Sequence, residues 1–184
     1  MNPLVAGIVL LLALVVWIAL ATSRIAQMRS RARSRWQAIE QQLQQRWELI
    51  PNVVASVQEH APQETEIYDR VQAALARSRA ETNPRALALA EEGLKEVMKK
   101  LFELVAQDSV IRTDKQFNEL AQRLEQVEDA IQKAKKHYNA ATRNYNLEIQ
   151  AFPKSFLANL FGFRDRQTYS ITDKTEQRSA RTHF

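Results

Sequence analysis

Few residues in this 184-residue sequence combine the types and the spacing that catalysis or metal binding needs. His60 and Glu64 lie four residues apart, which would place two metal ligands on one helix face, but two ligands without a third make a weak site. His137 and His183 fall on other segments, and the chain has no cysteine. Glycine-rich phosphate loops, G-x-S-x-G and H-E-x-x-H motifs are also missing. We therefore expect a protein that is not an enzyme, with no catalytic, cofactor or metal site.

Neighbouring acidic residues are the other pattern that can support acid–base chemistry. The sequence pairs Glu125 with Asp129, and Glu91 with Glu92. Because charged residues at such spacings usually form the solvated face of a helix, we interpret both pairs as surface residues.

Two polar pairs, Tyr138-Asn139 and Tyr145-Asn146, repeat at seven residues within an apolar stripe. A buried phenol packs like Phe, but its hydroxyl needs a hydrogen-bond partner. We predict a hydrogen-bonded seam that fixes the register of the helices. A ligand site is the alternative. The residues that could complete this polar network are Arg46, Arg77, Glu128 and Lys135.

A third motif, Leu49-Ile50-Pro51-Asn52, interrupts a helical pattern with proline. Pro51 removes an amide donor and frees a carbonyl near Trp47, while Asn52 can bond the interrupted backbone. We interpret the motif as a kink that shapes the meeting point of neighbouring helices. The functional alternative makes the kink a docking notch for a partner.

One long stripe positions the Tyr-Asn pairs. Its steps of three or four residues predict a single helix with coiled-coil-like packing, starting at a capping box formed by Thr113 and Gln116 and ending at Pro153. Its members are Phe117, Leu120, Leu124, Val127, Ile131, Ala134, Tyr138, Ala141, Tyr145, Ile149 and Phe152.

A second stripe runs from Trp36 through Ser78 and keeps its phase across Pro51 and Pro62, so we predict one kinked helix up to about Ala80. Asn83 and Pro84 then suit the cap and first turn of a third helix, which fades at Asp108-Ser109. A brief helix over 155–161 should end at Gly162, with Phe163 behind it. The polar segment 164–184 should be loosely ordered, with Tyr169 and Ile171 as candidates for docking.

The N-terminal run 4–22 has no charge and is long enough to cross a hydrocarbon core about 30 Å thick. A cleaved signal peptide is the alternative, but the start of the chain has no basic side chain and the run is long for a signal core. The basic residues that follow place the bulk of the chain on the cytoplasmic side, and they either snorkel at the interface or bind anionic lipid. They are Arg24, Arg29, Arg31, Arg33 and Arg35.

Composition agrees with a helical protein, because only 3 Gly and 5 Pro accompany 45% apolar residues. The net charge of +5 is concentrated in the arginine segment, so we expect no nucleic-acid partner. The fold class is therefore all-α, with a transmembrane helix continuing into an antiparallel bundle of long helices. The expected parts are a tail (1–3), the span (4–22), a basic segment (23–35), a bundle (36–163) and a polar tail (164–184).

Several motifs together resemble the LemA family. Arg46 and the following Leu49-Ile50-Pro51-Asn52 are similar to its R-x-x-L-I-P-N signature, and later elements follow in the family order. Those later elements are Ala76-Arg77, Glu128 with Ile131, Tyr138-Asn139, Tyr145-Asn146, Phe152-Pro153 and Phe161-Gly162-Phe163. The resemblance implies a single-pass bacterial membrane protein, often associated with membrane proteases of the HtpX type. Departures include Lys135 in place of the usual Arg and Thr142 in place of Val.

We expect a membrane-anchored helical scaffold or adaptor in the inner membrane, with the N-terminus outside and the bundle in the cytoplasm. Its partners would be membrane lipids, a membrane protease, or further copies of the chain. A homo-oligomer is expected because one short helix cannot cover both long stripes, which leaves Trp36 to Trp47 and Tyr145 to Phe152 open. A lipid- or ligand-sensing module is the competing class.

Overall fold

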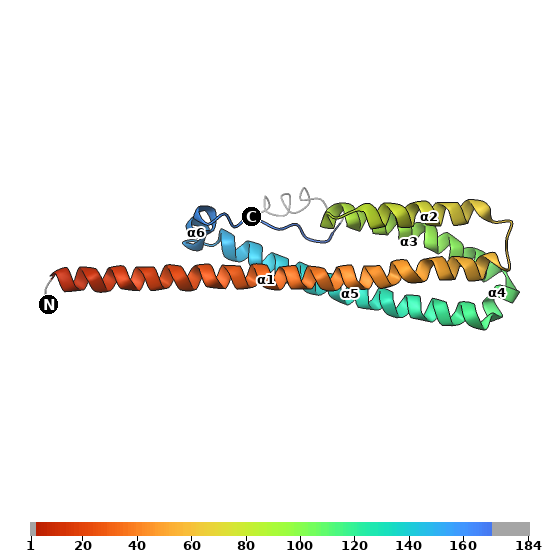
Figure 1. The fold of residues 1–184 in the computed structure, drawn as a ribbon, viewed down its shortest axis with the longest axis horizontal. Coiled ribbons are helices and arrows are strands. Elements are labelled where there is room, and N and C mark those ends of the chain that lie inside the picture. The colour runs from red at the N-terminus through yellow and green to blue at the C-terminus, as the bar shows by residue number, and fades with distance from the viewer. Residues whose placement is uncertain (1–2, 171–184) are drawn as a thin grey trace, which may run out of the picture.

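The structure is a computed structural model that describes residues 3–170. These residues form helices joined by short connections, with no strand among them (Figure 1). The expected all-α fold is confirmed. The helices are α1 (Pro3–Gln58), α2 (Thr65–Ala80), α3 (Pro84–Gln107), α4 (Ser109–Thr113), α5 (Lys115–Gln150) and α6 (Lys154–Leu160).

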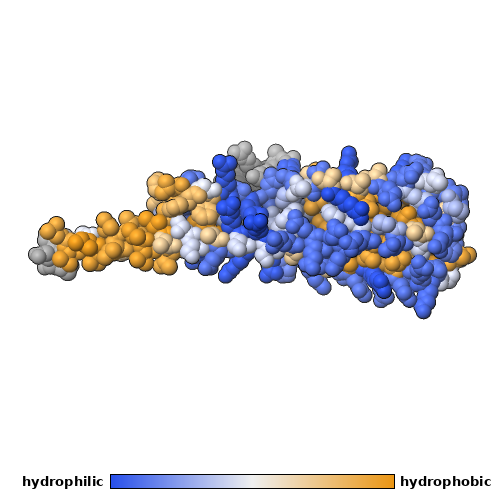
Figure 2. All heavy atoms as spheres, viewed as in Figure 1, coloured by the Kyte–Doolittle hydropathy of each residue, from blue (hydrophilic) through white to orange (hydrophobic). Residues whose placement is uncertain are grey.

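Helix α1 is the longest element and runs without interruption from the apolar N-terminal segment into the bundle (Figure 1). It includes Pro51, so the helical turns continue through the proline. The basic segment 23–35 is therefore part of the same rod and is not a separate linker. Outside the bundle the rod is apolar and exposed, whereas the bundle surface is largely polar (Figure 2).

The prediction of one helix up to Ala80 is wrong, because α1 ends at Gln58 and α2 begins at Thr65. The connection contains Pro62, which has no amide hydrogen to continue a helix. The Tyr68 hydroxyl donates to the Ala61 carbonyl at 2.7 Å and fastens this turn to α2. The three- and four-residue spacing of the apolar residues continues across the break because α2 folds back and buries its own apolar face in the same core.

The caps decide where the next helices begin. Asn83 accepts hydrogen bonds from the amides of Arg85 and Ala86, with Pro84 in the first turn, as expected. The predicted capping box at Thr113 is wrong, because 109–113 forms the separate helix α4 and the Thr113 hydroxyl donates to carbonyls within it. Asp114 caps α5 instead and accepts from the Phe117 amide at 2.6 Å.

The four longer helices run alternately up and down, and α1 and α5 form the most extensive pair (Figure 1). At the end far from the apolar rod, all four contribute to one apolar core. Its fully buried members are Ile50, Val53, Val57, Val71, Leu94, Leu101 and Ile111. We call this part the distal half.

The other half of the bundle, toward the apolar rod, contains only α1 and α5 as long helices (Figure 1). Here α6 and the extended segment 164–170 cover the seam, and Trp36 packs on the rings of Tyr138 and Tyr169. Ile39 and Leu43 are fully buried within the single chain. We call this part the proximal half. The stripe 36–47 is covered within the chain by α3 and segment 164–170, and α6 covers Tyr145 and Ile149, so these residues give no argument for a homo-oligomer, which stays a prediction.

Helix α6 ends as predicted. Gly162 has a left-handed φ of 71°, and the Phe163 amide donates to the Ala158 carbonyl at 2.8 Å, which is a Schellman-type closure. The stripe prediction is wrong at Phe152, which is 91% exposed because α5 has already ended at Gln150.

Candidate functional site

The most regular polar arrangement is a clasp of two asparagine side chains on α5 that hold the backbone of segment 164–170. The Asn139 side-chain oxygen accepts from the Tyr169 amide at 2.8 Å, and its NH₂ donates to the Tyr169 carbonyl at 3.0 Å. Asn146 makes the same pair with Arg166, at 2.9 and 2.8 Å. Each side-chain amide thus binds both the N–H and the C=O of one backbone residue, as a residue of a neighbouring antiparallel strand would.

The spacing explains why the pairs repeat at seven residues. Seven residues of helix advance about 10.5 Å at 1.5 Å per residue. An extended chain with three residues per turn advances about 9 Å over the three steps from Arg166 to Tyr169 and turns both residues to the same side. The two periods therefore match, and the extended segment runs antiparallel to α5.

The tyrosines complete the clasp. The Tyr138 hydroxyl donates to the Gln167 carbonyl at 2.6 Å, and that of Tyr145 to the Arg164 carbonyl at 3.1 Å. Both rings are almost fully buried, and burial raises the pKa of Tyr145. The two pairs lie on one seam, as predicted from the sequence. Their partner, however, is the C-terminal segment, which we expected to be loosely ordered.

The hydrogen bonds of the clasp do not hold the segment alone. Each contributes about 1 kcal/mol net, which is similar to the cost of ordering one residue of backbone. Burial of the Tyr169 ring, which is only 5% exposed, therefore adds to the stability of the bound segment. The other candidate for docking, Ile171, lies outside the described residues.

A second polar cluster centres on the buried carboxylate of Glu91 in α3. Arg46 of α1 pairs with it at 2.7 Å, and Trp47 Nε1 donates to it at 2.9 Å. Ser78 of α2 also donates to the carboxylate. Arg46 reaches Glu128 of α5 at 3.3 Å, so the four long helices meet here. We call this cluster the hub.

The hub corrects one prediction from the sequence. Glu91 was paired with Glu92 as a solvated face, but its side chain is 3% exposed, whereas Glu92 is exposed. The signal was available, because Glu91 lies four residues after Leu87 and three before Leu94, on the buried stripe of α3. Glu125 and Asp129 are exposed, as expected.

The Pro51 motif acts on the neighbouring helix. Since proline has no amide hydrogen, it leaves the Trp47 carbonyl free, and Arg79 of α2 donates to that carbonyl at 2.8 Å. Asn52 donates weakly to the Glu48 carbonyl at 3.3 Å. Arg77, which the sequence suggested for the polar network, is exposed on another face of α2.

A hollow of about 290 Å³ lies between the hub and the clasp. Lys135 on its wall is half-buried, 4.8 Å from the centre of the Tyr169 ring. Burial lowers the pKa of Lys135, against the opposing effects of Glu128 and Glu91. The hollow is lined by Arg46, Ala88, Glu91, Glu92, Lys95, Glu128, Gln132, Lys135, Tyr169 and Ser170.

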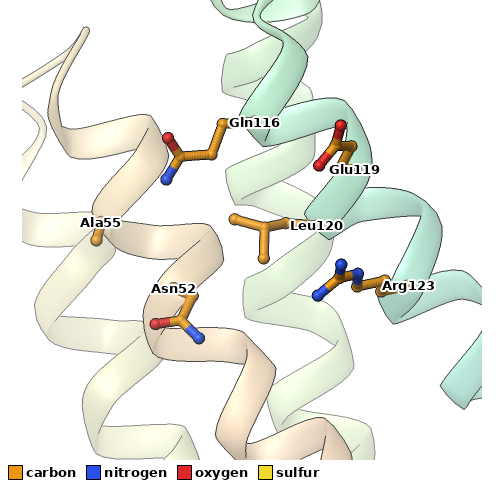
Figure 3. Close-up of a pocket in the computed structure, with 6 residues that line it drawn as sticks. All are labelled: Asn52, Ala55, Gln116, Glu119, Leu120 and Arg123. Atoms are coloured by element: carbon orange, nitrogen blue, oxygen red, sulfur yellow. The ribbon is translucent and has the colours of Figure 1, made fainter.

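An open groove of about 300 Å³ lies beside Asn52 at the distal end of the bundle. Figure 3 shows Gln116, Leu120 and Arg123 reaching from α5 toward α1. Asn52 and Ala55 of α1 and Glu119 of α5 complete its lining. The motif at Pro51 thus borders both the contact with α2 and this groove.

The remaining candidates lie apart from both polar clusters. The five arginines of the basic segment are exposed along α1, and Arg24 pairs with Glu148 of α5 at 3.4 Å. Pro153 starts the turn into α6. His60 Nδ1 lies 3.1 Å from the Ser56 carbonyl. Within residues 3–170, no three His, Cys, Asp or Glu side chains gather in a way that could hold a metal ion.

Comparison with known proteins places the sequence in a family. The model of the LemA family matches residues 35–184. Two curated relatives, Magnetosome protein MamQ 2 and Magnetosome protein MamQ 1 of Paramagnetospirillum magneticum (strain ATCC 700264 / AMB-1), are each 31% identical over 80 residues. The match covers 44% of this chain and 29% of each relative. Since the family model matches most of the sequence, the chain belongs to the LemA family.

Proposed function

We propose that this protein is a membrane-anchored helical scaffold or adaptor that binds another protein and performs no catalysis. The observation that carries the proposal is the continuity of α1, which passes from an apolar segment long enough to span a membrane straight into the bundle. A rod of this kind fixes the height and direction of the bundle above the bilayer.

The groove beside Asn52 is the docking place that we propose. Asn52 is 30 residues beyond Thr22, the end of the apolar run, so the groove lies about 45 Å from the membrane boundary at 1.5 Å per residue. A partner that occupies it needs a domain that projects this far. Membrane proteases of the HtpX type are the partner that the family suggests, and a second copy of the chain is the other.

Charge reversal on α5 tests the docking place. Glu119 lines the groove, whereas Glu125 is exposed outside it. We expect Glu119→Lys to reduce several-fold the co-purification of a partner with the full-length protein from membranes, and Glu125→Lys to leave it unchanged. Equal retention of partners by both variants would contradict the groove as a docking place.

Ligand sensing is the second candidate function, and the hollow beside Lys135 favours it. Tyr169 forms part of its wall, so a ligand there would contact the segment that the clasp holds. A ligand that acts in this way should change the hydrogen exchange of 164–170 in the wild type and lose its effect in Lys135→Ala. Unchanged exchange with every lipid headgroup and anion tested would argue against sensing at this place.

We also propose that the bundle is cytoplasmic and that the chain lies in the inner membrane of a bacterium. The support is the run of exposed arginines that follows the apolar segment on α1. A reporter fused after Phe184 should be active in the cytoplasm. Digestion of that end by protease added to intact spheroplasts would reverse the orientation.

A further inference from the structure

An exposed apolar patch lies at the end of the bundle from which the apolar rod emerges (Figure 2). We call it the α6 patch, and it consists of Phe152, Phe156, Leu160 and Phe161, which are 91, 71, 67 and 55% exposed. The other large apolar side chains that are exposed within the described bundle are scattered, at Leu89, Val110 and Leu147. Four large apolar side chains within ten residues are therefore unusual for this surface.

The patch cannot turn inward, because the opposite side of α6 is already packed. Leu157 and Ala158 are buried, and Ala158 belongs to an apolar cluster with Ile25 of α1 and Tyr145 of α5. The Schellman closure at Gly162 and the partly buried Phe163 fix the end of the helix in this position. The outward direction of the patch is thus built into the fold.

The height of the patch along α1 points to its occupant. Helix α6 packs on α1 near Ile25 and Met28, and Ala21 beside them is buried. These residues lie within about one to two helical turns of Thr22, where the uncharged run ends. Arg24 and Lys154 both pair with Glu148 at this level, which places two cations where lipid headgroups would lie.

We propose that the α6 patch inserts into the interfacial region of the same bilayer that α1 spans. The proposal rests on the proposed span of α1. Exposed phenylalanine and leucine side chains close to basic residues are typical of segments that lie in the membrane interface. The bundle then has two attachments, one crossing the bilayer and one lying in its surface. A single helix alone would let the bundle rotate about its axis, and the second attachment sets which face of the bundle meets the membrane.

The absence of cysteine in the sequence makes a clean test possible. Single-cysteine variants Phe156→Cys and Leu160→Cys of the full-length chain would carry a nitroxide label in nanodiscs of phosphatidylcholine and phosphatidylglycerol. Leu12→Cys reports on the span, and Val110→Cys, also exposed, reports on the far end of the bundle. Collision with oxygen measures contact with lipid, and collision with a nickel chelate measures contact with water.

We expect the labels at 156 and 160 to collide with oxygen several-fold more, and with the nickel chelate several-fold less, than the label at 110. Water contact at 156 and 160 equal to that at 110, with position 12 in lipid, would overturn the insertion and leave the span intact. Protection from both reagents would overturn it in favour of a contact with a second copy. Water contact at position 12 would overturn the span and the insertion together.

Discussion

The two halves of the bundle hold together by different means. In the distal half, four helices surround a core of aliphatic and aromatic side chains that exclude water. In the proximal half, two helices share their seam with an extended segment whose backbone is bound by asparagine and tyrosine side chains. An extended backbone has unpaired amides and carbonyls that apolar residues cannot satisfy. The side chains that face the seam between α1 and α5 are therefore polar where an extended segment takes the place of a packed helix.

The hub lies at the boundary between the halves, and it should be the most sensitive point. Replacing Glu91 with Gln removes the closest carboxylate from the buried guanidinium of Arg46 and leaves it Glu128 at 3.3 Å, so the cost should reach at most the about 3–5 kcal/mol of a fully broken buried pair. We expect that loss in the free energy of unfolding, measured by urea titration of the full-length protein in detergent. Glu92→Gln, one residue away and exposed, is the control and should change little. Equal effects would mean that the hub does not join the halves.

The distal core should follow with a loss of similar or smaller size. Leu101 is fully buried among the four helices, and truncation to Ala should cost about 2–5 kcal/mol by creating a cavity. The same truncation at Leu89, which is 53% exposed, should cost less than about 0.5 kcal/mol. Hydrogen exchange of the native Leu101→Ala protein should still show protection in 164–170. Loss of that protection would show that the clasp depends on the distal core.

Tyr169 should give the smallest effect at neutral pH. Its hydroxyl is buried and has no hydrogen-bond partner among residues 3–170, so Tyr169→Phe should leave stability unchanged or slightly higher. At alkaline pH the variants should separate. Burial raises the pKa of Tyr169, so above the ordinary value of about 10 only the unfolded chain releases this proton.

Wild-type stability should therefore fall as the pH rises above about 10, and it should fall less in Tyr169→Phe. The pKa of Lys135 is lowered, which works in the opposite direction but is present in both proteins. Parallel curves of unfolding free energy against pH for the two proteins would contradict the burial of this phenol.

The sequence predicted the helices well because their stripes and caps are local signals. Asn83-Pro84 and Gly162-Phe163 each act through a few neighbouring residues. The start of α3 and the end of α6 were therefore predicted correctly. The break at Pro62 was missed because a second helix that folds back onto the same core can continue the same spacing of apolar residues. Residue spacing alone does not distinguish that arrangement from a continuous helix.

The candidate site was predictable in part. The positions of Tyr138, Asn139, Tyr145 and Asn146 on one seam follow from helical periodicity, but their partner is backbone, which has no sequence pattern of its own. Glu91 was missed because its acidic neighbour suggested a solvated face, although its place on the buried stripe indicated otherwise. The contact of Arg79 with the Trp47 carbonyl depends on how two helices meet, which no local pattern encodes.

The central claim is that side chains of α5 hold the C-terminal segment as the missing element of the proximal half. Hydrogen exchange of the full-length double variant Asn139→Ala and Asn146→Ala tests it most directly, because the amides of Tyr169 and Arg166 donate to the two removed side chains. Asn144→Ala, exposed on the same helix, is the matched control. We predict that the double variant loses protection in 164–170 while α2 and α3 keep theirs. Protection of 164–170 equal to that of the Asn144→Ala control would contradict the account.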